Sequence, residues 1–95
     1  MDMSTLLELM VSRKASDLFI TAGMPASLKV DGRLAPVDGV ILSPEQARTL
    51  VYSVMTEGQR REFDHSHECN FAISESGLGR FRVSAFYQRN HTGMV

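Results

Sequence analysis

Arginine side chains are the groups in this sequence best suited to bind a charged ligand. Arg80 and Arg82 are two positions apart in a segment that alternates between apolar and polar residues, and Arg89 follows near its end. On an extended strand, Arg80 and Arg82 would share one face. The planar guanidinium group suits bidentate contact with phosphate or carboxylate. From spacing alone, the favoured alternative is that Glu68 on the neighbouring predicted strand pairs with one of them across a solvated sheet face.

A second group of candidate residues lies in His65-Ser66-His67-Glu68-Cys69. On an extended chain His65, His67 and Cys69 would point the same way, and imidazole with thiolate is a set that binds zinc. A closed structural zinc site needs four ligands, however, and the remaining histidine, His91, is isolated. Cys69 also continues the apolar face of the strand that follows it, so we expect neither a metal site nor a reactive thiolate.

Glycine-rich phosphate-binding patterns are incomplete. Gly77-Leu78-Gly79 is half of a dinucleotide-binding fingerprint, but it joins two predicted strands instead of opening a helix. The pattern GxxxxGK[ST] is absent, because neither Lys14 nor Lys29 follows a glycine. We therefore expect these residues to be non-catalytic by themselves.

Length and composition predict one ordinary globular domain, residues 1–95. The chain has 43% hydrophobic residues, and its 10 basic and 11 acidic residues give a net charge of −1. This balance does not favour binding to nucleic acid. A single cysteine, the lack of a long apolar run and the lack of a basic secretory signal predict an intracellular protein. An apolar strand-like pattern restarts at 91–95, so we expect the domain to be part of a longer protein.

Three segments predict helices, at about 5–13, 43–55 and 56–63. Thr5 and Glu8 fit a capping box for the first. Ser43 is a favourable N-cap for the second, with Gln46 completing the box. The third is expected to start at Thr56. Between and after these helices, strand patterns occupy 17–21, 27–30, 33–35, 68–74 and 80–87.

The strand patterns indicate an antiparallel arrangement. Asp31-Gly32 is a favoured two-residue hairpin turn, because both positions need positive φ. The last two strands each have one apolar and one polar face. We expect their apolar residues to form one dry face under the helix that carries Leu50, Val51 and Val54, namely Phe71, Ile73, Phe81, Val83 and Ala85. The order of elements predicts an α+β fold, with a mainly antiparallel sheet and helices packed beside it.

Four blocks of sequence carry a family resemblance: Ala15–Pro25, Lys29–Gly32, Gln59–Phe63 and Gly79–Phe86. In this order they resemble the N-terminal domain of the type IV pilus retraction (twitching motility) ATPases, the PilT/PilU type of the secretion ATPase superfamily. The resemblance covers nearly the whole chain. Phe19 stands where the family pattern has histidine, and Asn70 where it has an acidic residue. Both departures resemble the PilU-like branch.

The resemblance implies a PAS-like domain that precedes a RecA-like ATPase domain, which would bind ATP and Mg²⁺ beyond residue 95. Such subunits form a cytoplasmic homo- or hetero-hexamer at the inner-membrane face of a bacterium, on the membrane platform at the pilus base. The implied function is regulation and assembly: the domain packs on a neighbouring ATPase subunit and couples ATP hydrolysis to pilus retraction. Arg80, Arg82 and Arg89 would approach the nucleotide phosphates.

Two functions of other classes are alternatives to this reading. One is a stand-alone PAS-like sensor that encloses a small ligand, which an internal apolar pocket with convergent polar groups would favour. The other is a small metal-binding module at His65, His67 and Cys69.

Overall fold

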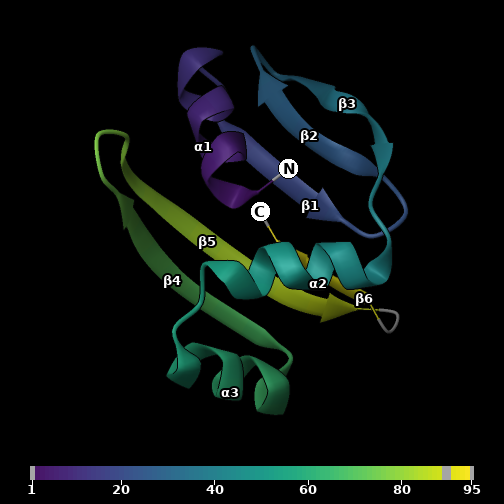
Figure 1. Ribbon diagram of the computed structural model, residues 1–95, viewed down its shortest axis with the longest axis vertical. Helices are drawn as coiled ribbons and strands as arrows, with labels where there is room; N and C mark the ends of the chain where they lie inside the picture. The colour runs from purple at the N-terminus through teal and green to yellow at the C-terminus, as the bar shows by residue number, and fades with distance from the viewer. Residues whose placement is uncertain (1, 89–90, 95) are drawn as a thin grey trace.

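The computed structural model describes residues 2–88 and 91–94, which form three helices and a six-stranded sheet (Figure 1). In chain order the elements are α1 (Met3–Ser12), β1 (Asp17–Thr21), β2 (Pro25–Val30), β3 (Arg33–Ile41), α2 (Pro44–Ser53), α3 (Glu57–Ser66), β4 (Glu68–Glu75), β5 (Gly79–Gln88) and β6 (His91–Met94). The predicted α+β class with antiparallel strands is confirmed.

The sheet consists of two antiparallel units that meet at β6. The strand order is β3-β2-β1-β6-β5-β4, and every neighbouring pair is antiparallel. Met94 lies opposite Ile20 of β1 and also opposite Ala85 of β5. The last described strand of the chain therefore occupies the middle of the sheet and joins the β1–β3 meander to the β4–β5 hairpin.

Capping boxes start α2 and α3 at the predicted residues. The Ser43 hydroxyl accepts the Gln46 N–H, and the Gln46 side chain accepts the Ser43 N–H at 2.8 Å. Thr56 and Gln59 repeat this reciprocal arrangement. Each box satisfies two backbone donors that a helix start leaves free, which fixes where the two helices begin.

The start of α1 differs from the prediction. The helix begins at Met3, and the carboxylate of the N-cap, Asp2, accepts the Thr5 N–H at 2.9 Å. This hydrogen bond lowers the pKa of Asp2. The predicted capping box of Thr5 and Glu8 is wrong because an equally good N-cap residue lies three positions earlier, which places Thr5 inside the first turn.

One hydrophobic core lies between the sheet and the three helices. Its largest fully buried side chains come from α1, β1, β2 and α2: Leu6, Ile20, Leu28 and Val51. The helix α2 packs on β6 and β1, α3 packs on β4, and α1 packs on β1. The β2–β3 hairpin turns at Asp31 and Gly32, with φ of 50° and 77°, as predicted.

The predicted register of β4 and β5 is confirmed by the pairs Cys69–Ala85, Phe71–Val83 and Ile73–Phe81. Burial along this shared face is uneven: the first pair and Val83 are buried, whereas Phe71, Ile73 and Phe81 are only half-buried. The prediction that α2 covers the whole face is therefore wrong. Since β6 lies between β1 and β5, α2 packs over β6 and β1 and leaves the far half of the hairpin uncovered by it.

Candidate functional site

The candidate site is the solvent-exposed face of β5, in the half of the strand that does not pair with β6. Arg80 and Arg82 are both exposed on this face. Val83 and Ala85, which anchor the strand on its other face, are only 4% and 1% exposed. Because the apolar face holds the strand in place, both guanidinium groups reach solvent from a fixed backbone.

No acidic residue of β4 lies directly opposite Arg80 or Arg82. Arg80 lies opposite Ser74 and Arg82 opposite Ala72, whereas Glu68 lies opposite Phe86 at the other end of β4. Within residues 2–88 and 91–94, Arg61 and Glu57 of α3 form an ion pair at 3.3 Å, and neither Arg80 nor Arg82 forms one. The alternative pairing of Glu68 with Arg80 or Arg82 is therefore not formed.

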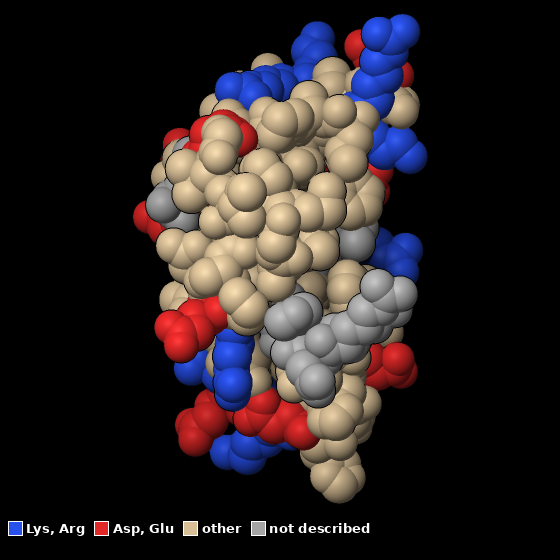
Figure 2. All heavy atoms as spheres, turned by 90° about the vertical axis from the view of Figure 1, so that its right-hand side faces the viewer, with Lys and Arg blue, Asp and Glu red and all other residues tan. Residues whose placement is uncertain are grey.

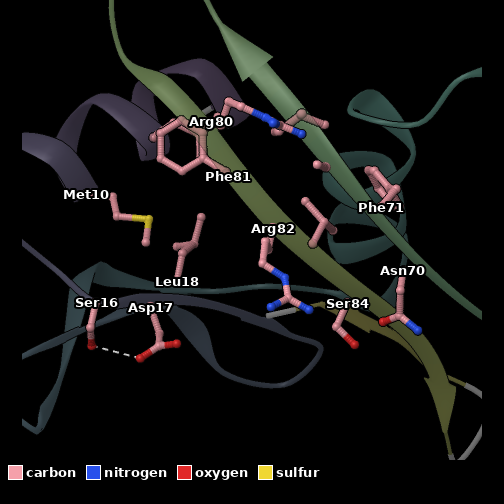
Figure 3. Close-up of a pocket in the computed structure, with 14 residues that line it drawn as sticks. Met10, Ser16, Asp17, Leu18, Asn70, Phe71, Arg80, Phe81, Arg82 and Ser84 are labelled. Carbon is pink, nitrogen blue, oxygen red and sulfur yellow. Dashed lines mark hydrogen bonds between the residues drawn. The ribbon is translucent and has the colours of Figure 1, made fainter.

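Arg80 and Arg82 share a face but extend in different directions (Figure 3). The guanidinium of Arg80 extends toward β4, and that of Arg82 extends toward β1. Because their guanidinium groups extend apart, the two arginines present separate positive groups and do not form one clamp. Asp17 of β1 accepts a hydrogen bond from the Ser16 hydroxyl at 2.8 Å. Arg89, the third predicted residue, lies outside the described residues.

A cleft of about 660 Å³ runs beside these arginines, between β1, α1 and the β4–β5 hairpin. Its apolar lining comes from α1, from the inward faces of the strands and from one outward-facing alanine of β4: Leu7, Met10, Leu18, Phe71, Ile73, Phe81, Val83 and Ala72. Its polar lining comes from the β1 end and the outward faces: Ser16, Asp17, Asn70, Arg80, Arg82 and Ser84. A smaller hollow of about 380 Å³ lies between α1, β3 and α2. Both open to solvent.

The histidine–cysteine segment does not form the arrangement that its spacing suggested. His65 is in the last turn of α3, and His67 ends that helix in the left-handed conformation with φ of 62°. The extended backbone that was expected for these residues is thus wrong for 65–67, and the strand begins only at Glu68. Cys69 is buried, and its Sγ lies 3.5 Å from the Glu62 carboxylate. Burial, and then this carboxylate, raises the pKa of the Cys69 thiol.

A polar junction between α2 and α3 escaped the sequence analysis. The Tyr52 hydroxyl hydrogen-bonds to the Asp64 carboxylate, and the Arg48 guanidinium carbon lies 4.8 Å from the centre of the Tyr52 ring. Arg60 donates twice to the Tyr52 carbonyl, at 2.8 and 3.0 Å. Burial, and then Asp64, raises the pKa of Tyr52. The contacts of Tyr52 with Asp64 and Arg60 cross the break between two helices, so no single helical period could have revealed them.

Comparison with known proteins shows what this domain is similar to. No protein-family model matches the chain. Over all 95 residues it is 63% identical to the type IV pilus ATPase PilU of Pseudomonas aeruginosa, and 36% identical to the type IV pilus retractation ATPase PilT of the same organism. Over its whole length the chain is therefore similar to part of the PilT/PilU-type ATPases. It spans about a quarter of those relatives, 25% of PilU and 28% of PilT.

Solved structures agree with this similarity. The pilus retraction motor PilT with bound ADP superposes with a TM-score of 0.90 at 32% identity, over 99% of this chain and 28% of that one. The Legionella pneumophila ATPase DotB shares the fold, with a TM-score of 0.76 at 24% identity over 97% of this chain and 26% of that one. None of the helices in the described residues is long and apolar enough to cross a membrane.

Proposed function

We propose that the chain is the N-terminal domain of a hexameric ATPase that retracts type IV pili and drives twitching motility. In this proposal it regulates and helps to assemble the ring from the cytoplasmic side of the inner membrane. The observation that carries the proposal is the 63% identity to PilU over every residue. The superposition on PilT with bound ADP supports a nucleotide-linked role.

The domain would act on ATP that another part of the protein holds. The sequence has no GxxxxGK[ST] loop, so the ATP and Mg²⁺ sites are assigned to a RecA-like domain beyond residue 95. Arg80 and Arg82, with Arg89, would bring positive charge to the phosphates. A guanidinium that meets the transferring phosphoryl group stabilises charge that spreads over its equatorial oxygens. Arg80 and Arg82 are exposed, have no carboxylate partner within the described part of the chain, and lie on a strand that is anchored by its other face, which suits this role.

A different face of the domain suits the assembly role. β3 is an edge strand whose residues are nearly all exposed, and large apolar side chains lie on or near it: Met24, Leu34, Val40 and Ile41. Figure 2 views the molecule from this side and shows charged residues gathered toward the two ends, with an uncharged area between them. An uncharged, partly apolar surface favours contact with another protein. We assign it to a neighbouring ATPase subunit, with the inner-membrane platform as a further partner of the ring.

The test is to substitute each arginine by alanine in the full-length protein. Arg61→Ala is the matched control, because Arg61 is exposed on α3 and lies away from the arginine face, which is the exposed face of β5 that carries Arg80 and Arg82. We expect unchanged melting and ring assembly for all variants, but a loss of roughly a hundredfold or more in ATP turnover for at least one of Arg80→Ala, Arg82→Ala and Arg89→Ala. If the parent has little turnover alone, ATP binding and retraction with the partner motor present are measured instead. The role in phosphate contact fails if all three match Arg61→Ala.

A further inference from the structure

The sheet has two edge strands, and they differ in how open they are to a further strand. β3, at one edge, carries Pro36 and a shift in its pairing with β2 between Pro25 and Ser27. Proline and bulges protect an edge against the addition of a strand. β4, at the other edge, pairs with β5 without interruption from Glu68 to Glu75 and contains neither proline nor glycine. β4 is therefore the open edge of the sheet (Figure 1).

One hydrogen bond shows which backbone groups of β4 point away from β5. The Tyr87 N–H donates to the His67 carbonyl at 2.9 Å, in the register of the ladder that follows. Hydrogen-bonded and non-hydrogen-bonded pairs alternate in an antiparallel ladder, so Cys69, Phe71 and Ile73 also bond to β5. The residues between them turn their N–H and C=O groups outward, and we call these groups the β4 edge: Glu68, Asn70, Ala72 and Ser74. Among the described residues, β5 is the one strand that pairs with β4, so this edge is free.

Antiparallel pairing restricts how a second copy of β4 fits this edge. The outward-pointing residues of one copy must lie opposite those of the other. In a two-fold pair, one residue of β4 therefore lies opposite its own copy. Asn70, Phe71 and Ala72 are the residues close enough to the middle of the strand for most of Glu68–Glu75 to pair.

The side chains favour Phe71 as the residue that lies opposite its own copy. In this register, Cys69 lies opposite Ile73. Glu75 lies opposite His67, at both ends of the pair. This side of the joined sheet is then apolar in the middle, and at each end a carboxylate faces an imidazole. On the other side, no two charged residues lie opposite each other.

The two neighbouring registers are less favourable. With Ala72 opposite its own copy, the Glu75 carboxylate lies opposite Cys69 on the apolar side, where it has no polar partner. With Asn70 opposite its own copy, the pairing runs into His65 and Ser66, which belong to α3 and are not extended. The first register places a charge badly, and the second shortens the ladder.

We propose that the β4 edge binds the same edge of a second copy of this chain, so that the two sheets join into one. The two β4 strands are antiparallel, and Phe71 lies opposite its own copy. Backbone hydrogen bonds supply the affinity, and the side-chain pairs set the register. A two-fold contact pairs a surface with itself, unlike the contacts between neighbours around a rotationally symmetric ring. The proposed dimer is therefore additional to the ring of the proposed function.

Disulfide cross-linking tests the register. Phe71 and its copy would form a non-hydrogen-bonded pair with Cα atoms about 4.5 Å apart, which a disulfide spans. Ile73 and its copy would lie four residues apart along the strand, about 13 Å, which is too far. In a Cys69→Ala background, we expect Phe71→Cys to give a covalent dimer under mild oxidation. Ile73→Cys, a half-buried position on the same face of β4, is the matched control and should stay monomeric.

Sedimentation of the natural 95-residue chain tests the contact without an added cysteine. We expect the average mass to rise toward that of a dimer as the protein concentration increases from roughly 1 µM to 1 mM. Ala72→Pro removes an N–H that points away from β5, so it should abolish the dimer and leave the β4–β5 ladder intact. Ala72→Thr keeps this N–H and is the matched control, and circular dichroism checks that both variants fold.

Other results would overturn the assignment. A natural chain that stays monomeric up to about 1 mM excludes the contact. Equal cross-linking by Phe71→Cys and Ile73→Cys shows collision without a register, and cross-linking by Ala72→Cys alone shows that the register is wrong. A dimer that Ala72→Pro leaves unchanged lies on another face of the domain. These measurements need neither ATP nor a ring, so they decide the proposal independently of the proposed motor function.

Discussion

Gly93→Ala tests how closely β6 is seated in the middle of the sheet. A Cβ at Gly93 would lie 2.6 and 2.8 Å from the Cε2 and Cζ atoms of Phe86, and 3.1 Å from the carbonyl oxygen of Ile20. Phe86 lies directly opposite Gly93 on β5. Glycine is therefore required here because two strands and a ring approach its Cα too closely for a side chain.

The expected cost follows from which neighbours can move. The half-buried Phe86 ring can turn aside, whereas the Ile20 carbonyl belongs to a paired strand and cannot. Overpacking of this kind costs about 2 kcal/mol, and the lower entropy of the unfolded alanine chain offsets about 0.5–1 kcal/mol of it. We expect a net loss of about 1–1.5 kcal/mol, which lowers the melting temperature of a domain of this size by roughly 5–10 °C.

Urea and thermal unfolding of the 95-residue chain measure this loss. Gly39→Ala is the matched control, since a Cβ at this position on β3 meets no atom within 4 Å. It should change stability by less than about 0.5 kcal/mol. In a Phe86→Ala background, the part of the cost that comes from the ring should be lost, whereas the part that comes from the Ile20 carbonyl should remain. If Gly93→Ala behaves like Gly39→Ala in the natural background, β6 does not pack against Phe86 and Ile20 as described.

Two further predictions concern the β4–β5 hairpin. Phe81→Ala should cost about 1–2 kcal/mol in urea unfolding of the 95-residue chain, clearly less than Phe63→Ala, because Phe63 is fully buried and Phe81 is not; equal losses would mean that Phe81 is covered. For Cys69, the folded-state pKa is raised above its ordinary value of 9.0, so the unfolded thiol loses its proton first and stability falls as pH rises above about 9. Cys69→Ala should flatten this alkaline decline between pH 8 and 10.5, and an unchanged slope would contradict the burial argument.

Features set by near neighbours in the sequence could be predicted. The capping boxes at Ser43 and Thr56 need only four residues each, and the alternation in 68–87 fixes on which face of the hairpin each residue lies. β3 was cut short in the prediction because an edge strand exposed on both faces shows no alternation. The position of α2 could not be predicted from its own apolar face. It depends on which strand lies beneath it, and that strand comes from the far end of the chain.

The candidate site, like the fold, could be predicted only in part. Alternation alone places Arg80 and Arg82 on one exposed face, as the structure finds. It cannot say whether Glu68 reaches them, because that depends on the pairing offset, which puts Glu68 opposite Phe86. The contacts of Tyr52 with Asp64 and Arg60 depend on the angle between two helices and had no signal in the sequence.

The central place of β6 links the two surfaces to which the proposed function assigns roles. The β3 face belongs to the β1–β3 meander and the arginine face belongs to the β4–β5 hairpin. Among the strands that the structure describes, the two units pair only through β6. A movement imposed at the β3 face by a neighbouring subunit would therefore reach Arg80 and Arg82 through β6, and through the consecutive helices α2, which packs on β1 and β6, and α3, which packs on β4. Weak seating of β6 should loosen that coupling before it unfolds the domain. Gly93→Ala in the full-length protein would then reduce ATP turnover at temperatures where the domain is still folded, whereas a loss of turnover that only follows unfolding would show that β6 contributes stability alone.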